Sequence, residues 1–164
     1  MSYQVKTILY ASDLNQSSLP AFMVAAREAA QHGAQIVWLN VVEPASHATE
    51  TMLQNFLGED DLREMREQGI DKIKAGMEDK IDRFSESVSD HGLTLPQRPA
   101  VRVEAGQAAE TIIEVAKEVE ADLIVMGSRS RQHSPLGRLF IGSTAQAVMH
   151  WSSVPLLVVP LKND

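Results

Sequence analysis

Residues 122–144 read DLIVMGSRSRQHSPLGRLFIGST, and this stretch decides how the chain folds. It begins with an apolar run from Leu123 to Met126 that is typical of a buried strand. The run stops at Gly127, and a polar loop follows with the side chains Arg129, Arg131, His133 and Arg138. A helical pattern then starts after Gly142. The order of strand, glycine, cationic loop and helix is typical of an α/β protein.

The end of this stretch, Gly142-Ser143-Thr144, suits a phosphate group. The first amides of a helix have no internal partner, and the helix dipole favours an anion there. Serine and threonine hydroxyls add hydrogen bonds, and the arginines of the loop add positive charge. The alternative is a plain strand-to-helix connection in which Ser143 merely caps the helix. No Gly-Lys-Ser/Thr follows the glycines, so this is not a Walker A loop.

The composition excludes several classes of function. The chain has 164 residues, 44% of them apolar, and no cysteine, which removes disulfides, thiolate metal sites and cysteine nucleophiles. A net charge of −7 argues against nucleic-acid binding. No apolar run is long enough for membrane insertion, and no signal-peptide core is visible, so we expect a cytoplasmic protein. The five histidines are scattered, without metal-ligand spacing.

Strand and helix patterns alternate along the chain. We expect strands at residues 5–11, 34–42, 100–104, 122–126 and 154–159. We expect four helices: one that begins at Ser17 or Ser18 and ends at Gly33, and three more at 59–88, 109–119 and 143–151. Residues 44–58 are expected to be a surface loop with a short helical piece, either a mobile flap or an ordered connection packed on the core.

This alternation predicts a doubly wound sheet of five parallel strands. Ligands of such sheets bind beyond the carboxyl ends of the strands, where the strand order reverses. Asp13, Val41 and Gly127 converge there if the fourth strand neighbours the first. The last strand is apolar, and Pro155 favours an edge position for it, which invites pairing with a second copy of the chain.

Four stretches resemble the universal stress protein family. They read ILYASD at 8–13, ADLIVMGSR at 121–129, LGRLFIGSTA at 136–145 and VPLLVVP at 154–160. The resemblance covers nearly the whole chain. It implies a single domain over residues 1–164, Rossmann-like and similar to the adenine nucleotide α hydrolases, with strand order 3-2-1-4-5. It also implies a homodimer formed through the last strand, Val154 to Val159.

In the ATP-binding branch of this family, the phosphates lie on a loop patterned glycine, two residues, glycine, nine residues, glycine and then serine or threonine. The resemblance implies that Asp13 binds nucleoside hydroxyls and that the backbone of Val41 meets the adenine. It implies contact with the nucleotide for Ala11, Met126, Gly127, Arg129, Ser130, Arg131, Gly142, Ser143 and Thr144. From its residue type alone, Asp13 can instead cap the turn before the first helix or act as a Mg²⁺-linked carboxylate.

Two departures from the family loop bear on this site. Ser130 replaces the second glycine, and eleven residues, 131–141, stand where the pattern has nine. The longer loop either reaches the phosphates with help from Arg129 and Arg131, or folds over and fills the site.

Two functions therefore stay open. The first is a regulatory dimer of the stress response that binds ATP, with or without Mg²⁺, and acts on an unknown protein partner. The second is a nucleotide-free dimer that acts through protein–protein interaction. No catalytic constellation is visible, so we expect no enzyme, or at most slow ATP hydrolysis, because no residue is identified that positions a water.

Overall fold

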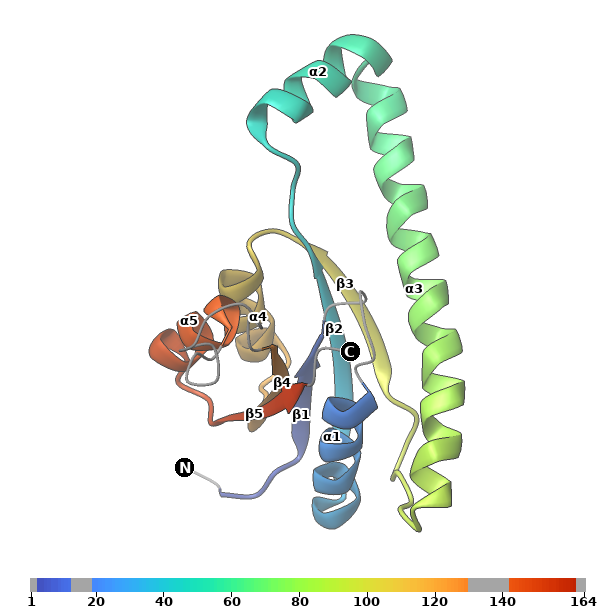
Figure 1. Cartoon of the computed structure of the whole chain (residues 1–164), viewed down its shortest axis with the longest axis vertical. Coiled ribbons are helices and arrows are strands. Elements are labelled where there is room, and N and C mark those ends of the chain that lie inside the picture. The colour runs from blue at the N-terminus through green and yellow to red at the C-terminus, as the bar shows by residue number, and fades with distance from the viewer. Residues whose placement is uncertain (1–2, 13–18, 130–141, 162–164) are drawn as a thin grey trace.

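The computed structural model describes residues 3–12, 19–129 and 142–161. These residues form five strands and five helices, in the order β1 (Thr7–Ala11), α1 (Leu19–His32), β2 (Gln35–Val42), α2 (His47–Leu57), α3 (Glu59–Asp90), β3 (Ala100–Ala105), α4 (Ala108–Glu118), β4 (Leu123–Arg129), α5 (Ser143–Trp151) and β5 (Leu156–Leu161). Figure 1 shows the strands gathered between the helices, with α3 running along one flank.

The sheet is parallel, and its strand order is β3-β2-β1-β4-β5, as expected from the sequence. The order reverses between β1 and β4, which are neighbours in the sheet although 111 residues lie between Ala11 and Leu123. The register pairs Ala11 with Leu39 of β2 on one side and with Met126 of β4 on the other. The carboxyl end of β1 is therefore the switch point of the fold.

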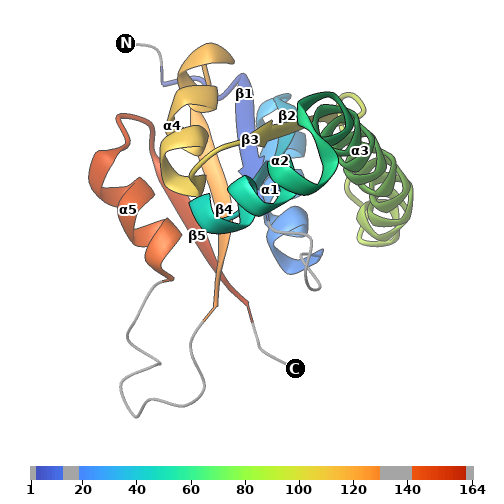
Figure 2. The ribbon, with the colours of Figure 1, turned by 90° about the horizontal axis from the view of Figure 1, so that it is seen from above.

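The helices cover the sheet on both faces (Figure 2). Successive residues of β1 point to opposite faces, as the period of a strand requires. Ile8 and Tyr10 are buried with α1 and α3, whereas Leu9 and Ala11 are buried with α4 and α5. Four aromatic rings pack together on the α1 and α3 face, namely those of Tyr10, Phe22, Trp38 and Phe84. Both faces of the central strands are thus buried, which explains their continuous apolar sequences.

The structure has five helices where we expected four, because the short helical piece expected within residues 44–58 is a complete helix. This helix, α2, has 11 residues and is capped by the Ser46 side chain. It does not pack on the core, since none of its residues is buried. The charged pattern at 59–88 is one continuous helix, and it runs through Gly69 and Gly76.

The fourth strand is longer than predicted. We expected it to end before Gly127, but Gly127, Ser128 and Arg129 continue it by pairing with β5. Arg129 is therefore a strand residue and not a loop residue. The reason lies in β5, which extends to Leu161, beyond the predicted end at Val159, and so offers two more partners to β4.

Charged side chains also link the elements at the surface. Arg98, before β3, donates to Asp82 and Glu78 of α3 across 2.6 Å each, and these two hydrogen bonds raise the pKa of its guanidinium. Within the described ranges, no helix has the length and apolar character needed to cross a bilayer.

Candidate functional site

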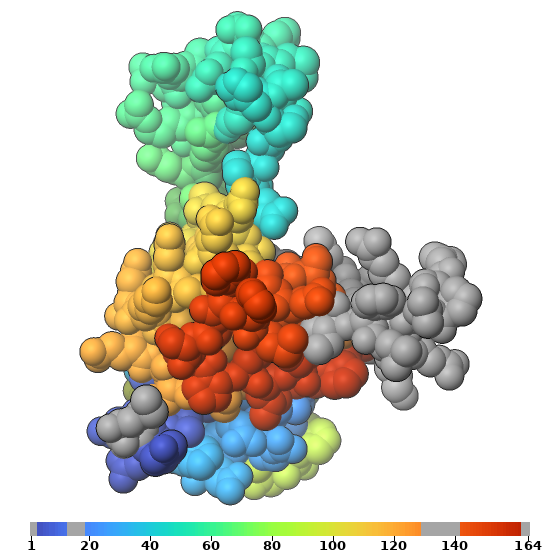
Figure 3. Space-filling model, turned by 90° about the vertical axis from the view of Figure 1, so that its left-hand side faces the viewer, coloured from blue at the N-terminus to red at the C-terminus, as the bar shows by residue number. Residues whose placement is uncertain are grey.

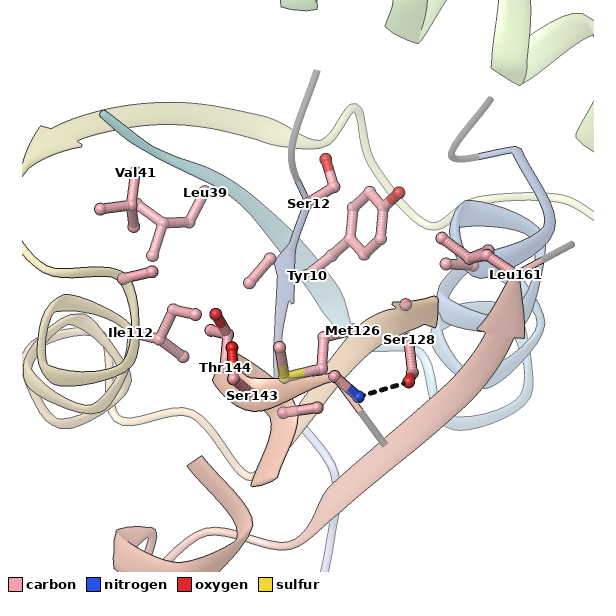
Figure 4. A pocket seen from close by; sticks show the side chains of 16 residues that line it. Tyr10, Ser12, Leu39, Val41, Ile112, Met126, Ser128, Ser143, Thr144 and Leu161 are labelled. Carbon is pink, nitrogen blue, oxygen red and sulfur yellow. Dashed lines mark hydrogen bonds between the residues drawn. The ribbon is translucent and has the colours of Figure 1, made fainter. Parts of the chain in front are cut away.

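A cavity of about 260 Å³ opens at the switch point, beyond the carboxyl ends of β1 and β4 (Figure 4). The amino-terminus of α5 closes one side and the beginning of α4 another. Sixteen residues line the cavity: Tyr10, Ala11, Ser12, Ala21, Leu39, Val41, Ala108, Ile112, Met126, Gly127, Ser128, Gly142, Ser143, Thr144, Ala145 and Leu161. The volume is slightly below the range of about 300–1,000 Å³ that is usual for small-molecule pockets.

Seven of the eleven residues expected at the site lie around this one cavity: Ala11, Val41, Met126, Gly127, Gly142, Ser143 and Thr144. Arg129 ends β4 next to them. The other three, Asp13, Ser130 and Arg131, lie outside the described residues. Sequence positions more than a hundred residues apart are thus brought together by the neighbouring positions of β1 and β4.

The wall formed by β2 and α4 is apolar in its side chains and polar in its backbone. Leu39, Val41 and Ile112 supply the apolar groups. The Leu39 carbonyl accepts the Ser12 amide on the β1 side, and the Val42 carbonyl accepts the Gly106 amide on the β3 side. Because backbone groups alternate along a strand, the amide and carbonyl of Val41 point to the β1 side, past the last pair of the β1–β2 ladder.

The opposite wall is the amino-terminus of α5. Its N-cap is Gly142, which has no side chain to bond the first amides of the helix. The amide of Gly142 itself donates to Oγ of Ser128 at 3.0 Å, the contact drawn in Figure 4. Ser143 and Thr144 add hydroxyls to the lining. The wall therefore presents helix amides and three hydroxyl groups, the donors that an anion requires.

Ser12, which the sequence reasoning missed, is held by three hydrogen bonds at the end of β1. Its amide donates to Leu39 at 3.1 Å, its Oγ accepts Nε1 of Trp38 at 2.7 Å, and its carbonyl accepts Nδ2 of Asn40 at 2.9 Å. Asn40 is almost fully buried, so this amide contact is made away from water. β2 therefore fixes the residue directly before Asp13.

Gly127 packs against Leu161 at the rim of the cavity. A Cβ at this position would lie 2.4 Å from Cδ1 of Leu161, so a larger residue here would make the Leu161 side chain move. Leu161 lines the cavity and is the last residue of β5. The sequence indicated the glycine but not its reason, because Leu161 is 34 residues further along the chain.

The described lining of the cavity contains neutral side chains throughout, and no group of three or more His, Asp or Glu within the described ranges could hold a metal ion. Tyr10, Leu39, Ile112, Ser128 and Leu161 were also missed. A search of alternate positions along each strand would have found Leu39, two residues before Val41 on the same face of β2.

An open parallel α/β sheet with a cavity at its switch point defines a protein of the doubly wound class, in which ligands bind at this position. A family model, the Universal stress protein family, matches residues 4–160. A universal stress protein of Thermus aquaticus is 31% identical over 157 residues, which cover 94% of this chain and 98% of that protein. The chain belongs to the universal stress protein family.

Solved structures share the fold. Universal stress protein UspA from Lactobacillus plantarum superposes with a TM-score of 0.67 at 23% identity and covers 95% of this chain and 98% of its own. A universal stress protein in complex with cAMP superposes with a TM-score of 0.57 at 22% identity, covering 95% and 97%. The sheet order and the two helical layers are thus those of the family.

Proposed function

We propose that this chain binds an adenine nucleotide, ATP with or without Mg²⁺, in the cavity between β1, β2, β4 and α5. The observation that carries the proposal is the pairing of two unlike walls. The β2 wall has apolar side chains, and the amide and carbonyl of Val41 point past the end of β1. The other wall is the amino-terminus of α5, with hydroxyl groups. A nucleotide has the same division into an apolar heterocycle and an anion.

The β2 wall suits adenine in particular. Val41 offers an amide donor and a carbonyl acceptor from one residue, beside the apolar side chains of Leu39 and Ile112. Adenine carries an acceptor at N1 and a donor at N6, so both can be satisfied by the Val41 backbone. Main-chain recognition needs no polar side chain, which is consistent with a wall that has none.

The α5 wall suits the phosphates. The amides of residues 143–145 start a nine-residue helix, and its dipole favours a negative charge at that end. Ser143 and Thr144 add hydroxyls to the lining at this point. Arg129 is the last residue of β4, and Ser130 and Arg131 come next in the sequence; we include all three as phosphate contacts. Asp13 follows Ser12, and we assign it to the ribose hydroxyls.

The comparisons support the nucleotide class. A structurally similar member of the family was solved with cAMP, an adenine nucleotide that places its base and its phosphate on one ribose. ATP, as the specific ligand, is our proposal for this chain. It follows from the family loop pattern that residues Gly127 and Gly142-Ser143-Thr144 match.

We further propose that the protein acts as a homodimer in the stress response, with the nucleotide state read by a protein partner. β5 lies at the edge of the sheet and pairs with β4 on one side, and among the described residues no strand pairs with its other side, which suits a second copy. Figure 3 shows the face that α5 and β5 form together. The cytoplasmic location expected from the sequence stays a prediction.

One observation favours the alternative, a nucleotide-free dimer that acts through its surface. The Gly142 amide already has an acceptor in Ser128 at 3.0 Å, so the phosphate wall is partly satisfied from within. A nucleotide must displace this contact or bind beside it.

The experiment that separates the two is mass spectrometry of small molecules released when the freshly purified protein is denatured, followed by calorimetric ATP titration of the emptied protein. We expect released ATP or AMP and binding restored on titration. Release of no nucleotide together with no heat of binding would contradict the proposal and favour the interaction protein.

A further inference from the structure

The helices α2 and the beginning of α3 project from the body of the protein as an arm, defined here as residues 47–67. In Figure 1 the arm stands beyond the carboxyl edge of the sheet, and in Figure 3 it forms a separate lobe above the body. The ion pair of Arg66 with Glu50 joins its two helices. Leu62 is buried within the arm, whereas α2 contributes no buried residue among those described.

The arm exposes large apolar side chains. Phe56 is 87% exposed and Met52 is 63% exposed, and a spacing of four places them on the same face of α2. Met65 of α3 is exposed as well. Large apolar side chains that are exposed together are typical of a surface that binds another molecule.

Charge determines what kind of molecule this surface fits. Residues 47–67 contain six carboxylates and two arginines, so the arm holds four of the seven net negative charges of the chain. Helix α3 begins shortly after Phe56 with three exposed acidic residues, Glu59, Asp60 and Asp61. One of the two arginines, Arg66, is engaged by Glu50 within the arm.

The net negative charge of the arm disfavours three kinds of occupant. Nucleic acid and anionic membranes carry the same sign of charge as the arm. A second copy of the arm packed face to face repeats all four net charges, and like charges across an interface are costly. A positively charged protein segment with apolar side chains fits both the negative charge of the arm and its exposed apolar side chains.

We propose that the arm docks a basic amphipathic helix of a partner protein, with its apolar side chains on Met52 and Phe56 and its lysines or arginines facing the carboxylates of the arm. This is the helix-on-apolar-surface mode of peptide recognition, with charge selecting the partner. The site is separate from the cavity, so it stands whether or not the cavity takes a nucleotide.

The test is a selection of random peptides, displayed on phage, against the full-length protein, with counter-selection against the double variant Met52→Ser, Phe56→Ser. We expect enriched peptides to be net positive, with apolar residues three and four apart. The best peptide, made synthetically with a fluorescent label, should lose roughly tenfold or more in affinity for the double variant.

The matched control is Tyr3→Ser, which removes an aromatic side chain that is 93% exposed and lies outside the arm. It should bind the labelled peptide as the parent does. Enrichment of acidic or uncharged peptides, or equal affinity for the double variant and the parent, would overturn the proposal. So would sedimentation data in which the double variant alone loses self-association, because the arm would then be an interface between copies.

Discussion

The backbone amide of Gly142 donates a hydrogen bond to Oγ of Ser128 across 3.0 Å, which joins the end of β4 to the amino-terminus of α5. The same amide faces the cavity where we place the phosphates. If a phosphate takes this amide, Ser128 must release it. The serine is then an internal substitute for the ligand, and the two compete.

Ser128→Ala tests this competition. Loss of one hydrogen bond should lower the free energy of unfolding of the empty protein by about 1 kcal/mol. ATP affinity should stay the same or increase, because no internal acceptor competes for the amide. Chemical denaturation and calorimetry measure the two quantities.

The matched control for Ser128→Ala is Ser152→Ala, which removes a hydroxyl that bonds the Val154 backbone away from the cavity. It should cost at least as much stability, because two hydrogen bonds are lost, and leave ATP affinity unchanged. A clear loss of ATP affinity in Ser128→Ala but not in Ser152→Ala would show that Ser128 itself holds the nucleotide.

Gly142→Asp separates folding from binding at the same position. The backbone of Gly142 has φ −52° and ψ 151°, which any residue adopts, and aspartate is a favourable N-cap, so the helix should be kept. A carboxylate against the phosphates should weaken ATP binding, with about 1 to 4 kcal/mol expected for two charges near a surface.

Gly142→Asn is its control, since it has the same shape and capping ability but no charge. It should retain most of the affinity in calorimetry, while both variants keep the melting temperature of the parent. Unchanged affinity in the aspartate variant would remove the amino-terminus of α5 from the proposed site.

Comparing nucleotides with different bases tests the proposed role of the Val41 backbone without any protein variant. Adenine offers an acceptor and a donor to the Val41 backbone, whereas guanine offers a donor at N1 and an acceptor at O6, the reverse order. Groups left unpaired in a buried site are costly, so ATP should bind at least about tenfold more tightly than GTP.

Inosine triphosphate, which also carries O6, should behave like GTP in the same competition titration. Equal binding of all three nucleotides would mean that β2 does not recognise the base.

The parts of the site that the sequence predicted are those that local patterns encode. Gly142, Ser143 and Thr144 were found because a helix start with glycine and hydroxyls is a contiguous signal. Val41 was found through the family resemblance, and its backbone direction becomes clear only with the register of β1, β2 and β3.

The missed features depend on contacts between distant segments. The hydrogen bond between Trp38 and Ser12 spans 26 residues, and the packing of Leu161 on Gly127 follows from how far β5 extends. The end of β4 was misplaced for the same reason, because a glycine ends a strand in isolation but not beside a paired neighbour. Helix α2 was underestimated because it lacks a buried face, and periodicity detects only buried faces.

The proposed dimer can be tested on one strand, because the direction of each backbone group of β5 follows from one hydrogen bond. The Ile124 amide donates to the Pro155 carbonyl. The backbone groups of every second residue, Pro155, Leu157 and Val159, therefore point towards β4. The backbone groups of the residues between them, Leu156, Val158 and Pro160, point to the open edge. Proline has no amide to donate, and at position 160 none is needed for the pairing with β4.

Val158→Pro should therefore remove an edge donor without breaking the sheet, and shift the protein from dimer to monomer in sedimentation velocity while its circular dichroism is unchanged. Leu157→Pro is the control, because its amide serves β4. It should instead lower the free energy of unfolding by about 1 to 3 kcal/mol, the cost of a buried carbonyl left without a donor. A Val158→Pro protein that sediments as the parent does would exclude the β5 edge as the dimer interface.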